Sequence, residues 1–485
     1  MENYPTQNIS KNIFSITLGQ AITLVINFLS ISLTARFLNV SDFGVFNYIL
    51  AIVVLLSKFI DLGLAQIAFR ETSKNKRDFS FIHNAVFLRL TVLIFTFLLF
   101  NLFIGYFKLT NVELFLSNIL FINIIISSKF QNIRELLEIP FKVNLEMHYI
   151  MIFNIVDNLL FLMMVIFMPF FQGGLVYIVL SYVFSNIPGF IASLFVLKKK
   201  YNFLMKLKIN NWQWILKESL PMGGFVLLVA LFQQIDILIL KNYDSAYATG
   251  IYAAATRLII PIGIIPLALA TTFFPRIVQN INNNASNEKI FKLVYKVLFF
   301  ISFMLAITVT FKAAGIIVFI FGKNYAESSK PMIFLFWSYV FLFYNYFSSD
   351  IVTAYNKQIF NFIYALFVVG VDLFFIFMLL PSYSFLGVAV AKFLASILGS
   401  IYIQYILLKL KVKPGFMNLK VIGWSCAMAI SLYLISSLPL FIYLLSSIII
   451  MFVLIKLIKY FDDEEIMQIF RIIKKEEWGI KFINF

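Results

Sequence analysis

Long runs of hydrophobic residues, separated by short polar stretches, recur along the whole chain. A run of about 20 apolar residues is long enough for an α-helix to cross a bilayer. Read with a window of this length, the sequence predicts fourteen such runs, near residues 13–35, 44–67, 81–107, 112–133, 149–171, 174–197, 218–241, 248–274, 293–321, 331–355, 358–380, 384–408, 420–439 and 441–459. The pattern indicates an all-α polytopic membrane protein with about fourteen transmembrane helices.

The composition supports a chain that lies mostly in lipid. Of its 485 residues, 61% are apolar and only 13% are charged, whereas a soluble globular protein is about half apolar and a quarter charged. The single cysteine, Cys426, excludes an intrachain disulfide. Two histidines, His83 and His148, are too few for a clustered imidazole metal site. We therefore expect no bound metal and no cofactor.

Lysine and arginine are distributed unevenly between the two sides of the predicted membrane. They cluster after even-numbered runs, at Arg70, Lys74, Lys76 and Arg77, at Lys198, Lys199, Lys200, Lys206 and Lys208, at Arg276, Lys289 and Lys292, and at Lys409, Lys411, Lys413 and Lys420. The positive-inside rule makes this side, and both termini, cytoplasmic. The net charge of +16 thus reflects topology, and we expect no nucleic-acid partner. The polar start, 1–12, indicates no removable signal peptide.

The stretches between the runs are short, and they contain no motif for nucleotide binding. None is longer than about 25 residues, which is too short for a folded catalytic domain. The sequence also contains neither G-x-x-x-x-G-K-[ST] nor a G-x-G-x-x-G after a strand. We therefore expect a transporter driven by a gradient or by the membrane potential, with proton or sodium coupling left open, and not an enzyme.

The two halves of the chain carry similar residues at a constant spacing. Lys11, Gly44, Phe46 and Arg70 match Lys217, Gly250, Tyr252 and Arg276 after 206 residues, and Lys142 and Asp157 match Lys357 and Asp372 after 215 residues. Six spans start and end on one side, so the copies share an orientation, with a pseudo-two-fold axis along the membrane normal and a site between them. The predicted parts are an N-terminal six-helix lobe (1–197), a cytoplasmic linker (198–217), a C-terminal six-helix lobe (218–411), helices 13 and 14 (412–460) and a cytoplasmic tail (461–485).

Short motifs in both halves resemble a known family. They are ARFLNVSDFGVF at 35–46, DLGL at 61–64, Arg70-Glu71, ESLP at 218–221, GIYAAATRL at 250–258 and FPRI at 274–277. The pattern resembles the polysaccharide-transport proteins, the Wzx-type flippases of lipid-linked oligosaccharides, and is shared across the multidrug, oligosaccharidyl-lipid and polysaccharide exporter superfamily. The resemblance implies two six-helix lobes around a central cavity, two additional C-terminal helices and alternating access.

Charged residues inside the predicted spans are candidates for the site. The cations are Lys58, Arg89, Lys129, Arg257, Lys312 and Lys392, and the carboxylates are Asp61, Asp157, Asp236, Asp350 and Asp372. A lysine or arginine at the centre of a span costs about 2.5–3.5 kcal/mol, so these side chains should face the bundle interior or water. The candidate ligands of an anionic headgroup are Arg257, Lys392, Lys58, Lys312 and Arg36.

Each of these cations has a simpler alternative role. The planar guanidinium of Arg257 suits a phosphate, and it precedes Pro261, Gly263 and Pro266, which can interrupt the helix; the alternative is a pair with Asp236. Lys58 lies three residues before Asp61, so an intrahelical pair is equally open. Lys392 and Lys312 can extend toward headgroups. Arg36 either contacts a lipid phosphate or braces the turn at Asp42.

Other polar residues are candidates for coupling, gating or sugar binding. Asp61, Asp157, Asp236 and Asp372 are candidate coupling carboxylates, with helix packing as the alternative for the matched pair Asp157 and Asp372. Arg70 and Arg276 are interpreted as topology anchors and gate contacts. Tyr339, Tyr344, Asn345, Tyr346 and Ser348 in the tenth span either bind sugar or join helices.

The resemblance, taken together with the interior cations, implies a flippase that moves a polyprenyl-diphosphate-linked oligosaccharide repeat unit from the inner to the outer leaflet of the bacterial cytoplasmic membrane. Such a protein would serve surface polysaccharide synthesis, for example of O-antigen lipopolysaccharide, beside a polymerase and a chain-length partner. Alternatives with the same fold are a cation-coupled multidrug exporter and a peptidoglycan-precursor lipid flippase. A membrane polysaccharide polymerase or glycosyltransferase would need a longer outer loop for its acid/base residues.

Overall fold

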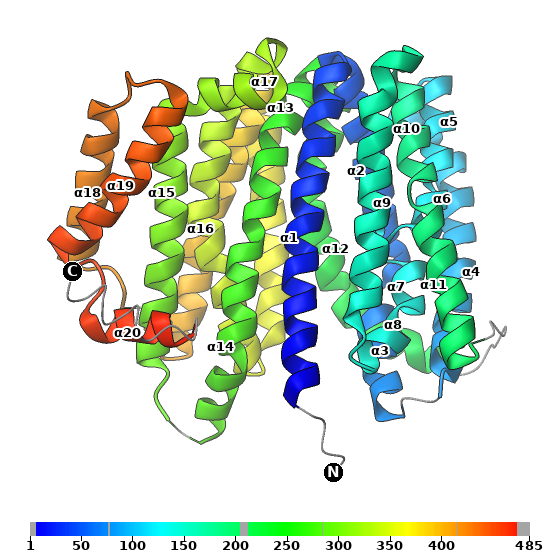
Figure 1. Ribbon diagram of the computed structural model, residues 1–485, viewed down its shortest axis with the longest axis horizontal. Helices are drawn as coiled ribbons and strands as arrows, with labels where there is room; N and C mark the ends of the chain where they lie inside the picture. Colours follow the sequence, from blue (N-terminus) through cyan, green and yellow to red (C-terminus); the bar gives the residue numbers. More distant parts are fainter. Residues whose placement is uncertain (1–5, 76–77, 204–211, 284, 414, 473–485) are drawn as a thin grey trace. The chain divides into compact units, whose positions relative to one another are not determined.

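The computed structural model describes residues 6–75, 78–203, 212–283, 285–413 and 415–472, and every regular element within these ranges is a helix (Figure 1). The chain divides into two compact units. Unit 1 comprises Met1–Arg257, Ile320–Tyr325 and Ile376–Val388, and unit 2 comprises Leu258–Phe319, Ala326–Phe375 and Ala389–Phe485. Parts of the predicted linker (204–211) and of the predicted tail (473–485) lie outside the described residues.

Unit 1 contains the first seven predicted spans and the start of the eighth. Its helices are α1 (Thr6–Phe37), α2 (Val40–Asp61), α3 (Leu64–Lys74), α4 (Ser80–Leu102), η1 (Ile104–Phe107), α5 (Asn111–Leu120), α6 (Ile122–Ile126), η2 (Ser128–Phe130), α7 (Ile133–Leu137), α8 (Ile139–Val143), α9 (Met147–Phe167), η3 (Met168–Phe171), α10 (Leu175–Phe184), α11 (Ile187–Tyr201), α12 (Trp212–Tyr243) and most of α13 (Ala246–Ile259). Within this unit α1 packs on α9, and α2 packs on α12.

Unit 2 holds most of the remaining chain. Its elements are η4 (Ile260–Gly263), α14 (Ile264–Asn282), most of α15 (Glu288–Phe321), α16 (Ser329–Ala354), both ends of α17 (Gln358–Lys409), α18 (Leu419–Leu434), α19 (Leu440–Ile458) and α20 (Asp463–Ile472), and the short η5 (Lys323–Ser328) is divided between the units.

The helices correspond to the predicted spans. Ten helical segments in the described ranges are long and apolar enough to cross a membrane. One of them, α17, joins two predicted spans at Ser384, where the backbone has φ 50° and ψ −137°. The shorter apolar helices Asn111–Ile126 and Leu419–Leu434, together with α16, account for the others. The prediction of an all-α polytopic membrane protein with about fourteen spans is confirmed.

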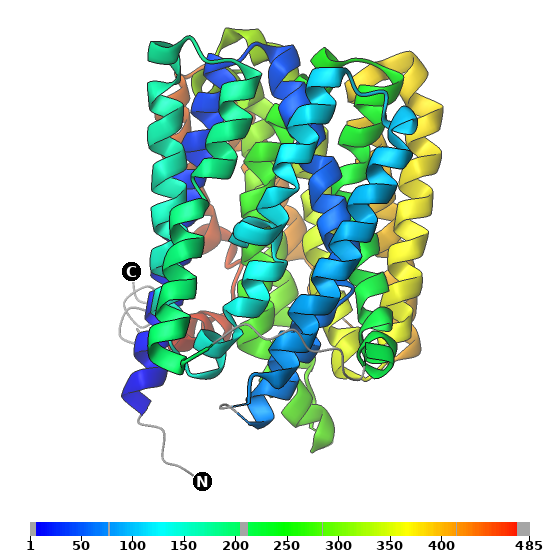
Figure 2. The ribbon, with the colours of Figure 1, turned by 90° about the vertical axis from the view of Figure 1, so that its right-hand side faces the viewer.

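The fourth span is interrupted, which the hydrophobic pattern did not predict. After α6, Ser127 is extended, η2 makes one tight turn, and Gln131 takes a left-handed conformation (φ 51°, ψ 56°) before α7 begins (Figure 2, in cyan). Ser127 accepts a hydrogen bond from the Lys129 amide through its own Oγ. Serine and asparagine side chains compete with helical hydrogen bonds in this way, so the polar residues from Ser127 to Asn132 end the helix.

Two glycines bring α2 and α13 into backbone contact. A Cβ added at Gly44 would overlap the carbonyl oxygen of Ala246, and a Cβ added at Gly250 would overlap that of Val40. Val40 and Ala246 are themselves 206 residues apart, as are the two glycines. A contact in which each residue meets the counterpart of its partner is the mark of a two-fold relation. The α2–α13 contact therefore follows the internal repeat.

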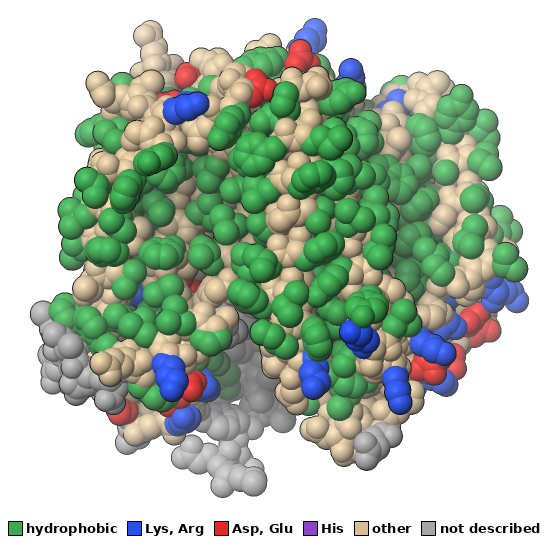
Figure 3. All heavy atoms as spheres, turned by 180° about the vertical axis from the view of Figure 1, so that it is seen from behind, with side chains coloured by type: hydrophobic (Ala, Val, Ile, Leu, Met, Phe, Trp, Pro, Cys, Tyr) green, Lys and Arg blue, Asp and Glu red, His purple; other side chains and the backbone are tan. Residues whose placement is uncertain are grey.

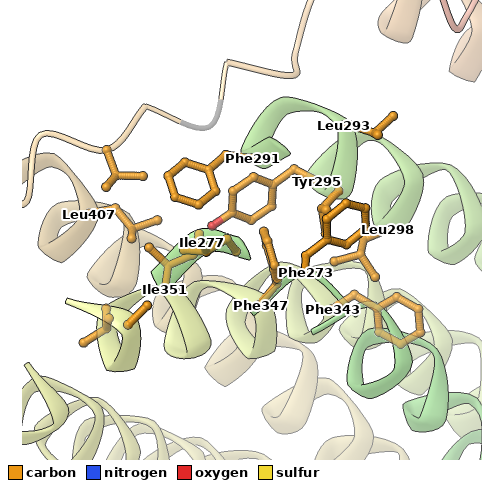
Figure 4. Packing of buried hydrophobic residues seen from close by; sticks show 14 of the residues in the cluster. Phe273, Ile277, Phe291, Leu293, Tyr295, Leu298, Phe343, Phe347, Ile351 and Leu407 are labelled. Carbon is orange, nitrogen blue, oxygen red and sulfur yellow. The ribbon is translucent and has the colours of Figure 1, made fainter. Parts of the chain in front are cut away.

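The interior of unit 2 is aromatic. Figure 4 shows Tyr295 among Phe291, Phe347 and Ile277. The ring centroids of Tyr295 and Phe347 are 5.0 Å apart, in an edge-to-face arrangement that favours aromatic pairs. The Tyr295 hydroxyl also shares a 2.7 Å hydrogen bond with Ser348 Oγ, so the buried phenol is satisfied. This cluster joins α14, α15, α16 and the end of α17.

The last helices pack on α15 in the same unit (Figure 1, orange to red). Trp424 of α18 is completely buried, with its ring 4.8 Å from that of Phe300. The short helix α20 is tied to α15 by ion pairs, at 2.8 Å from Lys289 to Glu464 and at 2.6 Å from Lys296 to Glu465. Its position is therefore set by charge as well as by apolar contact.

The outer surface of the helices is apolar. On the face shown in Figure 3, hydrophobic side chains cover the middle of the helices and Lys and Arg gather near their ends. Large side chains such as Leu102, Phe374 and Ile449 are more than 60% exposed. A continuous exposed apolar surface of this kind suits contact with lipid.

Candidate functional site

Arg257 is an interior cation of unit 1 whose side-chain partner is neutral. It lies in the last turn of α13, and both Nε and Nη2 donate to the side-chain oxygen of Asn47 on α2, at 2.9 and 2.5 Å. Among the described residues, no carboxylate lies within ion-pair distance of its guanidinium. The alternative pairing with Asp236 is wrong, because Asp236 accepts a hydrogen bond from the Tyr252 hydroxyl instead.

The helix ends two residues after Arg257, where the prolines that follow it predict an interruption. α13 stops at Ile259, and the 3-10 turn η4 contains Pro261 and Gly263. Proline cannot donate the hydrogen bond that would continue the helix. Arg257 is therefore held at a helix end. Its side chain is half buried, and the group that its planar guanidinium binds is the side-chain amide of Asn47.

Lys58 and Asp61 have separate partners, so the intrahelical pair, one of the two roles left open for Lys58, does not form. Asp61 forms a buried ion pair with Arg89 of α4. Lys58 donates to the side-chain oxygen of Gln131 at 2.7 Å. An arginine from a neighbouring helix reaches the carboxylate instead, and its planar guanidinium suits a carboxylate better than an ammonium does. Lys58 thus keeps its charge uncompensated by Asp61.

Asp157 joins three helices through a buried arginine. Its carboxylate accepts from Arg134 at 2.5 Å and from the Gly189 amide at 3.0 Å, and Arg134 also binds Glu138 at 2.9 Å. A Cβ at Gly189 would overlap this carboxylate. The geometry is that of a helix-packing contact. Arg134 was missed because it follows the predicted fourth span instead of lying inside it.

Lys129, on the 3-10 turn η2 of the interrupted span, is an interior cation that lies against two aromatic rings. Its ammonium stands over the ring of Tyr182 at 4.7 Å and over that of Phe161 at 5.1 Å. The charge of Arg257 acts on both Lys129 and Tyr182. The sequence placed Lys129 inside a span but gave no reason to connect it with Arg257.

The remaining candidate arginines lie near helix ends. Arg36 Nε donates to the carbonyl oxygen of Ile320 at 2.8 Å, and it is Asn39 that caps the turn at Asp42. Arg70 is half exposed and bonds to Glu71 at 2.9 Å and to Glu218 at 3.2 Å, which links α3 to α12.

Lys74 changes the pKa of Glu71, one of the two partners of Arg70. A hydrogen bond from Lys74 is the main reason why the pKa of the Glu71 carboxyl lies below its ordinary value.

The counterpart of Arg70 in the second half, Arg276, is exposed on α14 in unit 2.

In unit 2 both candidate lysines are engaged by other groups. Lys392 forms a buried 2.5 Å ion pair with Asp372. Lys312 donates to the carbonyl oxygen of Leu438 at 2.7 Å and lies over the Tyr443 ring, so it holds the α18–α19 turn on α15. In this structure, Arg257 is therefore better able than Lys392 to bind an external anion.

The polar residues of the tenth span mainly join helices. Asn345 donates to the Ser396 carbonyl oxygen at 3.2 Å, and Tyr344 binds Gln404 on α17. Of the two interpretations of this cluster, the contacts favour interhelical hydrogen bonding. In the part of the chain that the structure describes, no group of three or more His, Cys, Asp or Glu side chains is arranged to hold a metal ion.

Two comparisons found proteins that are similar to this chain over most of its length. It is 24% identical to the capsular polysaccharide biosynthesis protein CapF of Staphylococcus aureus over 406 residues, which cover 81% of this chain and 98% of that protein. Its fold is similar to that of the lipid II flippase MurJ in an inward closed conformation, with a TM-score of 0.75 at 16% identity over 90% of this chain and 97% of that one.

A second transporter structure shares the fold, and a family model covers the first half of the chain. An inward-facing multidrug resistance MATE family transporter of the MOP superfamily matches with a TM-score of 0.63 at 14% identity, over 82% of this chain and 99% of that one. The model described as polysaccharide biosynthesis protein matches residues 9–281, more than half of the sequence. The chain therefore belongs to the polysaccharide biosynthesis protein family.

Proposed function

We propose that this protein is a flippase that carries a polyprenyl-diphosphate-linked oligosaccharide from the inner to the outer leaflet of the bacterial cytoplasmic membrane. The observation that carries the proposal is Arg257, an interior arginine bonded to the neutral side chain of Asn47. A diphosphate offers the paired oxygens that a guanidinium binds with two parallel hydrogen bonds. The family and the fold support the same activity.

We further propose that the membrane potential drives transport. Moving negative charge outward across an inside-negative membrane is favourable by about 2.3 kcal/mol per elementary charge per 100 mV. Three candidate coupling carboxylates, Asp61, Asp157 and Asp372, are bound to protein cations. These ion pairs occupy carboxylate oxygens that a coupling sodium ion would need. Alternating access between two lobes completes the mechanism.

The test is translocation in proteoliposomes that contain a fluorescent diphosphate-linked oligosaccharide. We expect the wild-type chain to accelerate its movement to the opposite leaflet, and an imposed inside-negative potential to raise the outward rate. Arg257→Gln should lose most of this activity, whereas Lys323→Gln, an exposed control, should keep it. Acceleration that survives Arg257→Gln in a folded protein would contradict the role of this arginine.

A peptidoglycan-precursor lipid carries the same diphosphate, so Arg257 by itself does not separate the two substrates. The same assay with a lipid-linked muropeptide as a second substrate distinguishes them. We expect faster transport of the oligosaccharide. Faster transport of the muropeptide would assign the protein to the alternative lipid flippase function.

A further inference from the structure

The interruption of the fourth span is fixed by the surrounding helices. Ser57 donates to the Phe130 carbonyl oxygen at 2.8 Å, Asn132 donates to the Ser57 carbonyl oxygen at 2.8 Å, and Arg89 donates to the Asn132 carbonyl oxygen at 2.5 Å. Irregular backbone at membrane depth persists only where protein or water satisfies its polar groups. Because side chains from α2 and α4 do so here, the break is a built feature of unit 1.

This break presents a cation without a hydrogen-bond acceptor. Lys129 Nζ is covered from solvent, and among the described residues it donates no hydrogen bond. An ammonium has three donors, and the rings of Tyr182 and Phe161 supply only a cation–π attraction of about 2 kcal/mol when desolvated. A buried charge left in this state is costly. Packing alone therefore does not explain why a lysine is buried at this position.

The carboxylates on this side of unit 1 are bound by a cation other than Lys129. It interacts electrostatically with Arg134, Arg257 and Asp157, and Arg134 is paired with both Asp157 and Glu138. Both carboxylates are thus already bound by Arg134, and neither forms an ion pair with Lys129 among the described residues. The two cations without a carboxylate of their own are Lys129 and Arg257, and both act on the same side chain, Tyr182.

We propose that Lys129 is a second ligand of the transported anion, so that the break in the fourth span and the end of α13 together bind a lipid-linked diphosphate. The inference rests on the proposed function and deepens it. Arg257 would bind one phosphate through its planar fork, and Lys129 would bind the other as a point charge. Lys129 leaves the aromatic rings when the anion arrives, which exchanges a cation–π contact for charge-assisted hydrogen bonds.

The experiment measures binding to the full chain in phosphatidylcholine nanodiscs. The probes are geranylgeranyl diphosphate, geranylgeranyl monophosphate and inorganic pyrophosphate, and the variants are Lys129→Met, Lys129→Arg and Lys142→Met. Lys142 is the matched control, because it lies in the same unit but is paired with Glu135 at 3.0 Å. We expect Lys129→Met to weaken diphosphate binding at least tenfold and monophosphate binding much less, Lys129→Arg to restore it, and Lys142→Met to change neither.

A folding measurement separates binding from structure. Lys129→Met removes a buried charge and keeps an apolar stem, so its melting temperature should equal or exceed that of the wild type. A clear fall in melting temperature would make Lys129 a structural cation and overturn the proposal. Equally tight binding of inorganic pyrophosphate would identify a free-anion site and overturn the lipid-linked assignment.

The outcomes also separate the inference from the proposed function. Wild-type diphosphate affinity in Lys129→Met, with a loss in Arg257→Gln, would reject Lys129 as a ligand while the flippase proposal stands. No diphosphate binding by the wild-type chain would reject both.

Discussion

Replacing Asn47 by aspartate tests directly whether the uncompensated charge of Arg257 matters. Asparagine and aspartate have nearly the same shape, and the Asn47 side-chain oxygen already accepts two hydrogen bonds from Arg257, at 2.9 and 2.5 Å. Asn47→Asp should therefore turn this contact into an ion pair without moving the arginine. An anionic ligand would then have to compete with a carboxylate that belongs to the protein.

The size of the effect follows from Coulomb's law. Two unit charges about 4 Å apart attract by about 4 kcal/mol at an effective dielectric constant of about 20. Since each 1.4 kcal/mol is a tenfold change in affinity, the loss of diphosphate affinity should approach a factor of about 1,000. Desolvation of the new carboxylate makes this an upper value, and we expect a loss of about 100-fold or more.

The assay is geranylgeranyl diphosphate binding in nanodiscs, beside translocation in proteoliposomes. Asn47→Ala is the matched control, because it removes the amide without adding a negative charge, and it should leave the diphosphate affinity equal to or tighter than that of the wild type. The reasoning is refuted if Asn47→Asp binds within about threefold of the wild type. Equal losses in both variants would show that the amide positions Arg257 and that the added charge is irrelevant.

Three other predictions concern stability. Gly44→Ala should lower stability by about 1–3 kcal/mol, because its Cβ meets backbone, whereas Gly423→Ala, which has open space, should not; equal melting temperatures would contradict the contact. Lys392→Met should cost about 3–5 kcal/mol by leaving Asp372 buried without its ion-pair partner, and adding Asp372→Asn should recover most of the loss in thermal unfolding. A hydrogen bond from a lysine lowers the pKa of the Asp462 carboxyl. The contribution of Asp462 to α20 docking therefore exists above the ordinary carboxyl pKa of about 4 and is lost as the pH falls below it. Amide exchange corrected for intrinsic rates should show that α20 opens in acid and does not change between pH 5 and 8.

Hydrophobic runs were sufficient to predict the architecture of the chain. The number of spans and the helix end after Arg257 depend on local properties, namely apolar length and the missing amide hydrogen of proline. The interruption of the fourth span escaped this reasoning because its neighbours, such as Ile124 and Ile126, remain strongly apolar. Hydropathy averages over about 20 residues and cannot register six residues that leave the helix.

The partners of the charged residues were harder to predict. Spacing along one helix suggested Lys58 with Asp61, whereas Asp61 binds Arg89, 28 residues away. The partner of Arg257, Asn47, is 210 residues away. Because asparagine is neutral, the pattern of charges in the sequence does not identify it as a partner. A long cationic side chain can reach any helix that packs beside its own. Its partner therefore depends on helix packing, which the sequence alone does not predict.

The paired glycines of α2 and α13 restrict which residues can stand where these two helices meet. A larger residue at either position collides with a carbonyl oxygen of the opposite helix. Because the obstacle is backbone and not a side chain, room for a Cβ requires the two helices to move apart. We therefore expect that a side chain at Gly44 or at Gly250 widens the separation of α2 and α13 at both positions, because each glycine faces the backbone of the other helix.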